Sequence, residues 1–145
     1  MINALDFTLY PRSLVPPLSF LGLIISLYVW YSQRSGKPIA CWTRDCDRII
    51  RSPYSRLLGI HNSAIGSTVF FIIFVITLLP HEGINSRPYL ASFLFVALIL
   101  LSFIGALVSL YLTYIQLFVL RGICNWCITS AVLILTIFIL TMTNW

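Results

Sequence analysis

Charged residues are scarce in this chain. Only 9% of its 145 residues are Asp, Glu, Lys or Arg, whereas 59% are hydrophobic, and the mean hydropathy is +0.97. An ordinary soluble domain has roughly 25% charged residues, so the composition excludes that class. Acidic residues number four against nine basic ones, and cysteine occurs only four times. No basic domain stands apart from the apolar segments, which argues against a nucleic-acid-binding protein.

The apolar residues form four long segments. A transmembrane helix needs about 20 residues, within a range of roughly 17–25. The segments run over about 14–31, 63–79, 89–120 and 123–142. We therefore predict an all-α integral membrane protein, a single domain (1–145) built as a bundle of four transmembrane helices. The third segment exceeds the thickness of the bilayer, and Gly105 is the expected weak point in it.

The loop over residues 32–62 is the longest connection. It holds six of the nine basic residues, namely Arg34, Lys37, Arg44, Arg48, Arg51 and Arg56. Within it, residues 47–58 place polar and apolar side chains on opposite faces at helical spacing. We expect a short amphipathic helix in the plane of the membrane interface, shortened by Pro53. Asn62 is expected to cap the helix that follows.

The four cysteines form two pairs. Cys41 and Cys46 fall in the long loop, and Cys124 and Cys127 begin the last apolar segment. With four spans, the long loop and the last turn face the same side of the membrane, so the two pairs can exchange electrons. A Cys-x-x-Cys at the start of a helix favours the thiolate, because unpaired N–H groups there stabilise negative charge. We expect the loop pair to swing between a soluble dithiol and the fixed pair.

Two non-enzymatic interpretations stay open beside redox chemistry. The cysteines can be static structural disulfides, which persist in oxidising compartments. A four-cysteine zinc site is also compatible with the spacing, although a lipid boundary is an unusual place for a structural zinc. Redox chemistry without a bound metal is the interpretation that we favour.

Three stretches of the sequence resemble a known family. Residues 109–129, SLYLTYIQLFVLRGICNWCIT, are similar to the junction of the third and fourth helices in the vitamin K epoxide reductase family. Residues 46–55, CDRIIRSPYS, and residues 59–66, GIHNSAIG, resemble that family's loop and the entrance to its second helix. The resemblance covers nearly the whole chain, and both cysteine pairs fit it.

The resemblance implies an enzyme that generates disulfides de novo. Bacterial members are similar in role to DsbB: they oxidise a thioredoxin-like or DsbA-like partner and reduce a membrane quinone such as ubiquinone or menaquinone. Carried over by position, Cys127 meets the quinone and pairs with Cys124. Cys46 forms a transient disulfide with Cys124, and Cys41 exchanges with the partner. Because many members carry a fused thioredoxin-like domain and this sequence has none, we expect the partner to be a separate protein.

Three further residues are candidates for binding the quinone. Ser52 and Asn62 match polar positions of the family near the quinone, and Trp126, between the cysteines, is placed to stack on it. Ala131 stands where the animal epoxide reductases carry a tyrosine. This departure disfavours reduction of vitamin K epoxide and leaves the quinone-linked disulfide reaction intact. A vitamin K epoxide or quinone reductase that works in the opposite physiological direction stays open as the alternative.

The charge distribution conflicts with the expected location of the cysteines. The cysteine side carries the six basic loop residues and Arg121, whereas the other side carries Arg12 and Arg87. The positive-inside rule places the richer side in the cytoplasm. Disulfide formation instead favours an extracytoplasmic site. We expect a multi-pass protein of the cell (inner) membrane with extracytoplasmic cysteines, and keep the inverted orientation as the alternative.

Overall fold

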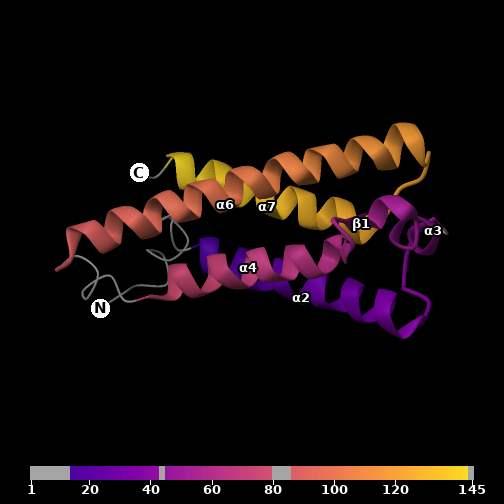
Figure 1. The fold of residues 1–145 in the computed structure, drawn as a ribbon, viewed down its shortest axis with the longest axis horizontal. Coiled ribbons are helices and arrows are strands. Elements are labelled where there is room, and N and C mark those ends of the chain that lie inside the picture. The colour runs from indigo at the N-terminus through magenta and orange to yellow at the C-terminus, as the bar shows by residue number, and fades with distance from the viewer. Residues whose placement is uncertain (1–13, 43–44, 80–85, 144–145) are drawn as a thin grey trace.

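The computed structural model describes residues 14–42, 45–79 and 86–143, so the expectations for Arg12 and Arg44 fall outside it. Four long helices lie along one another in an elongated bundle (Figure 1). They are α2 (Val15–Ser35), α4 (Asn62–Leu78), α6 (Pro88–Tyr114) and α7 (Asn125–Thr143). The loop between α2 and α4 contains the helix α3 (Cys46–Ile50), a 3-10 turn η2 (Pro53–Ser55) and the hairpin strands β1 (Arg56–Leu57) and β2 (Ile60–His61). A π-helical turn, η3 (Ile115–Val119), extends α6.

The four helices form a ring in which each packs against two others. Helix α2 contacts α4 and α7, and α6 contacts the same two helices from the other side. Buried aliphatic side chains fill the centre, among them Ile73 of α4 and Ile137 of α7. Successive helices run in opposite directions, so α3, the hairpin and the start of α7 meet at one end of the bundle (Figure 1).

The outer surface of the bundle is apolar. Helices α2, α7 and the continuous helix of α6 and η3 (Pro88–Val119) are each long and apolar enough to cross a membrane, and α4 is a shorter apolar helix of 17 residues. Along α6, the large exposed side chains include Phe93, Val96, Leu100, Ile104 and Leu107. An apolar surface of this extent marks contact with lipid or with another protein. The helices therefore indicate a membrane protein.

Local sequence explains where the helices begin and end. Prolines stand in the first turns of α2 and α6, where their missing N–H group costs nothing. Gly36 ends α2 with a φ of 72°, a left-handed conformation that glycine adopts without steric strain. Inside the bundle, Ser102 and Thr141 donate hydrogen bonds to carbonyl oxygens of their own helices, at 2.7 Å each. Their hydroxyls are therefore satisfied in an apolar core.

Gly105 is not a weak point in the third long helix, contrary to the prediction. Helix α6 continues through it, and a Cβ atom at this position would lie 3.0 Å from Cγ1 of Ile134 on α7. Gly105 therefore lets two helices approach closely. The irregularity falls at η3, where Leu120 N–H bonds to the carbonyl of Ile115, five residues earlier.

The prediction of an amphipathic helix over residues 47–58 is also wrong. The helix is shorter than predicted, and its apolar face contacts protein. The helix ends at Ile50, and Pro53 begins the separate turn η2. Ile49 and Ile50 are buried against the protein, whereas the segment was expected to rest on the membrane interface. The arginines of this segment remain exposed. Packing against the bundle end, not lipid, therefore accounts for the apolar face of α3.

Candidate functional site

All four cysteines meet at one end of the bundle. Cys41 and Cys46 are joined by a disulfide, and Cys124 and Cys127 are thiols. Cys46 is only 1% exposed and Cys124 is 0% exposed, and both belong to one buried cluster against which Cys41 and Cys127 pack. Aliphatic side chains of α2, α3 and the loop complete this cluster. The structure therefore brings the two pairs together, as their exchange of electrons requires.

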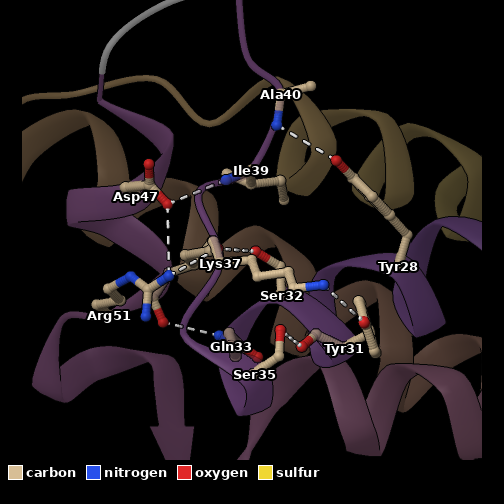
Figure 2. A network of polar contacts seen from close by, with 11 residues as sticks. Tyr28, Tyr31, Ser32, Gln33, Ser35, Lys37, Ile39, Ala40, Asp47 and Arg51 are labelled. Carbon is tan, nitrogen blue, oxygen red and sulfur yellow. Dashed lines mark hydrogen bonds and ion pairs between the residues drawn. The ribbon is translucent and has the colours of Figure 1, made fainter.

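The loop that carries Cys41 is fixed to the helices on both sides (Figure 2). Ile39 N–H donates to Oδ1 of Asp47 at 3.3 Å, and Ala40 N–H donates to the hydroxyl of Tyr28 at 3.3 Å. The carbonyl of Lys37 accepts hydrogen bonds from Ser32 Oγ at 2.8 Å and from Arg51 at 2.9 Å. These bonds tie residues 37–40 to α2 and to the end of α3.

Cys46 lies on the short helix α3 within the long loop, and the swing of both members of the pair stays a prediction. Cys46 is the first residue of α3, and its sulfur is enclosed by the bundle. Cys41 is partly buried, and its neighbour Trp42 is 93% exposed. Among the described residues, the disulfide is therefore more exposed on the side of Cys41 than on the side of Cys46.

The second pair lies at the start of α7. Cys127 N–H donates to the sulfur of Cys124 at 3.4 Å, so Cys124 takes the position of a helix cap. The hydrogen bond from the Cys127 side chain lowers the pKa of Cys124 below its usual range, and the backbone N–H groups of Cys127 and Trp126 act in the same direction. Burial of Cys124 opposes them. The thiolate of Cys124 is thus favoured, as expected for a helix start.

Trp126 connects the two cysteine pairs. Its indole N–H donates to the carbonyl of Ala40, next to Cys41, and its ring lies 5.0 Å from that of Tyr28. Tyr28 in turn accepts a hydrogen bond from Ala40 N–H. The stacking of Trp126 on a quinone stays a prediction, and the contact that the sequence did not predict is the one that holds the loop against the Cys-x-x-Cys.

A cavity of about 180 Å³ lies inside the bundle next to the second pair. All four long helices contribute to its lining, together with α3, η2 and η3. Cys127 lines it, as do the three residues predicted to bind a quinone, Ser52, Asn62 and Trp126. The other lining side chains are mostly apolar. An apolar cavity of about 150 Å³ accommodates a benzene ring, so this one is large enough for a quinone ring.

Asn62 and Ser52 differ in their capacity to bind a ligand. The hydroxyl of Ser52 donates to the carbonyl of Ile49 at 2.7 Å, so its proton is already used. Asn62 donates through Nδ2 to the carbonyl of Tyr54 at 3.1 Å, and its Oδ1 has no hydrogen-bond partner within the described ranges. It makes no capping bond, because the cap position belongs to His61. The amide of Asn62 is therefore the more available group.

Two glutamines at the cavity were not predicted. Gln33 donates to the carbonyl of Ile50 at 2.7 Å and accepts a hydrogen bond from Ser63, so it joins α2, α3 and α4. Gln116 of η3 is 5% exposed and lines the cavity together with Cys127. The sequence did contain a signal for Gln116. It is the one amide side chain in the apolar run of residues 98–120, and polar residues in membrane spans are often functional.

The described part of the chain contains no group of three or more His, Cys, Asp or Glu residues arranged to hold a metal ion. The bond between Cys41 and Cys46 uses two of the sulfurs that a four-cysteine zinc site needs. The arrangement instead suits thiol–disulfide exchange that ends at an apolar cavity.

Comparison with known families agrees with this chemistry. The model of the vitamin K epoxide reductase family matches residues 14–142 of the 145-residue chain. The chain belongs to this family. Members of the family are oxidoreductases, and membership suggests a redox function.

Proposed function

We propose that this member of the vitamin K epoxide reductase family forms disulfides de novo. A separate thioredoxin-like or DsbA-like protein gives two electrons to Cys41–Cys46. The electrons pass to Cys124–Cys127 and then to a membrane quinone as the final acceptor. The observation that carries the proposal is the grouping of the cysteines: all four pack in one cluster, and Cys127 also lines the apolar cavity.

The first transfer takes place at the exposed side of the disulfide. A thiolate of the partner attacks the sulfur of Cys41, and Cys46 leaves as a thiolate. The second thiol of the partner then attacks the mixed disulfide and releases Cys41. The partner has been oxidised to a disulfide, and Cys41 and Cys46 have been reduced. Burial of Cys46 directs the attack to Cys41.

The second transfer takes place inside the buried cluster. The thiolate of Cys46 attacks Cys124 of an oxidised Cys124–Cys127 pair, and Cys127 leaves. Cys41 then attacks Cys46, which restores the Cys41–Cys46 disulfide and releases Cys124. The hydrogen bonds at the start of α7 stabilise the Cys124 thiolate that departs. The structure has the loop pair oxidised and the Cys-x-x-Cys pair reduced, which is the product of this step.

The cavity fits a quinone ring in size and polarity. The second N–H of Asn62 Nδ2 is available as a donor to a quinone carbonyl, since the bond to Tyr54 uses only one of two. A bound quinone accepts two electrons and two protons as the bond between Cys124 and Cys127 forms. The residues of this chain supply the reacting sulfur, one polar contact and an apolar enclosure that excludes water.

The proposal includes a four-span protein of the cell membrane with its cysteine end outside the cytoplasm. Helix α4, with 17 residues, reaches the lower limit of about 17 for a span. At the cysteine end, Arg51 binds the carbonyl of Lys37, and Arg48 binds the carbonyl of Leu120 at 3.0 Å. These arginines have a structural role, which explains their presence without reference to membrane orientation.

Anaerobic turnover of the purified protein tests the proposal. A reduced thioredoxin-like protein serves as the electron donor, and a short-chain ubiquinone or menaquinone serves as the acceptor. We expect quinone reduction by the wild type and none above background by Cys127→Ala. A folded wild-type protein that reduces neither quinone, with either thioredoxin-like or small dithiol donors, would contradict the proposal.

A further inference from the structure

Gln116 is the most deeply buried amide at the cavity. It lies on η3, where the π-helical hydrogen bond changes the direction of the side chains that follow α6. The carbonyl oxygen of its backbone accepts a hydrogen bond from Gly122 N–H at 3.0 Å, which fixes the backbone on both sides of the last turn. π-Helical turns are rare and occur frequently at functional sites.

The side chain of Gln116 carries an unpaired acceptor. Gln116 lines the cavity together with Cys127. Its carbonyl oxygen, Oε1, is buried and has no hydrogen-bond partner among the residues that the structure describes. Gln33, which lines the same cavity, differs in that both its amide nitrogen and its amide oxygen are paired with protein groups. An unpaired buried acceptor is unfavourable unless a ligand supplies the donor.

A quinone and its reduced form differ in the hydrogen bonds they can make. The two oxygens of a quinone only accept, whereas each hydroxyl of the reduced form also donates. The unpaired Oε1 of Gln116 can therefore bind the reduced form and not the oxidised form. Gln116 and Cys127 line the same cavity, so a quinol bound there can reach both the amide oxygen and the sulfur from which the electrons come.

We propose that Gln116 recognises the reduced quinone, through a hydrogen bond from a new hydroxyl of the quinol to Oε1. The proposal rests on the function proposed above. In the step it assists, the two S–H bonds of Cys124 and Cys127 break and one S–S bond forms. Two electrons and two protons pass to the quinone, whose two carbonyl oxygens become hydroxyls. Gln116 gains no proton, because an amide does not titrate, but it stabilises the product of the transfer next to the sulfur.

Binding of a matched pair of probes tests this role. The probes are tetramethyl-1,4-benzoquinone and its hydroquinone, whose ring carries no position open to addition by a thiol. The protein is the full chain with Cys124→Ser, so that Cys127 keeps its thiol but no Cys124–Cys127 disulfide can form. Anaerobic calorimetry then measures the Kd of each probe without turnover.

We expect Gln116→Leu to weaken binding of the hydroquinone by about tenfold, as for the loss of one buried hydrogen bond, and to leave quinone binding within about twofold. Gln116→Glu keeps an acceptor oxygen and should retain the preference for the hydroquinone. Gln33→Leu is the matched control: its amide is already paired, so the ratio of the two Kd values should not change. Equal weakening of both probes by Gln116→Leu, or loss of the preference in Gln116→Glu, would overturn the role of Gln116.

Turnover of the wild type separates this result from a failure of the proposed function. If the wild type reduces quinone and Gln116→Leu leaves the ratio of Kd values unchanged, only the assignment to Gln116 is wrong. If the wild type neither turns over nor binds either probe, the proposed function itself is wrong, and the inference falls with it.

Discussion

The two cysteine pairs share one buried cluster but have different surroundings. Cys41–Cys46 joins an anchored loop to the short helix α3, and the exposed Trp42 follows Cys41 directly. Cys124 and Cys127 lie at the start of a long apolar helix, and Cys127 lines the internal cavity. The first pair thus lies beside an exposed side chain, and the second lies beside an apolar cavity. In the proposed relay, this difference lets the first pair react with a protein in water and the second with a quinone in lipid.

Removal of Cys127 should have the largest effect on this division of roles. In Cys127→Ala, no disulfide can form at the cavity, so quinone reduction should fall by a factor on the order of 10³ or more. The loop pair should still exchange with the protein partner in a single turnover. Anaerobic absorbance of the quinone and acid-quenched thiol trapping measure the two reactions separately. Full quinone reduction by this variant would show that the second pair is not the donor.

Removal of Cys41 should slow only the reaction with the protein partner. Because Cys46 is buried, Cys41→Ala should slow oxidation of the protein partner by about 100-fold or more, since the attacked sulfur is missing. A small dithiol such as dithiothreitol should still support quinone reduction by direct entry to Cys124–Cys127. Parallel assays with the two donors make the comparison. Equal losses with both donors would contradict a relay in which the loop pair is the entry point.

The pKa of Cys124 should distinguish the second pair by its pH dependence. The Cys127 side chain makes the largest contribution to stabilising the Cys124 thiolate. The pKa of Cys124 is therefore lower in the folded than in the unfolded chain. The thiolate therefore stabilises the fold above the unfolded pKa, and this contribution is lost as the pH falls through the folded pKa. In a Cys41→Ser/Cys46→Ser background, ultraviolet titration should give a midpoint that Cys127→Ala moves upward. An unchanged midpoint would show that the contact between the two side chains does not control the thiolate.

The contact of Trp126 with Ala40 should give the smallest effect. Trp126→Phe keeps an aromatic ring against Tyr28 but removes the indole N–H, which should cost about 1 kcal/mol of local stability. Hydrogen exchange of residues 37–42 should become about five- to tenfold faster by the same estimate. Tyr28→Phe, which removes the acceptor for Ala40 N–H, is the matched variant and should act alike. Exchange rates unchanged in both variants would mean that neither residue anchors the loop.

Hydropathy and the position of proline were sufficient to predict the helices. Each of the four apolar segments forms a helix whose bounds differ by only a few residues from those expected, because apolar runs that meet lipid have no other stable backbone structure. The helix start at Cys124–Cys127 was predictable for the same reason. The cavity-lining positions of Ser52, Asn62 and Trp126 followed from the family resemblance and not from any local pattern.

Tertiary contacts decided what the sequence could not predict. Burial of Ile49 and Ile50 depends on the packing of α3 against the bundle, which a periodic pattern cannot distinguish from contact with lipid. The π-helical turn and the burial of Gln116 depend on how α6 meets the last turn. The hydrogen bond of Trp126 joins positions 86 residues apart in the chain. Such pairings have no local sequence signal.

Trapping of the intermediate between the two pairs tests the relay most directly. In Cys41→Ala/Cys127→Ala, only Cys46 and Cys124 remain, and both lie in the buried cluster. Mild oxidation in membranes, followed by non-reducing peptide mass spectrometry, should show a disulfide between Cys46 and Cys124 within one chain. The matched variant Cys46→Ala/Cys127→Ala, which keeps Cys41 and Cys124, should form the corresponding bond far less. If Cys46 and Cys124 stay reduced in a folded protein, the two pairs do not exchange electrons and the proposed relay is wrong.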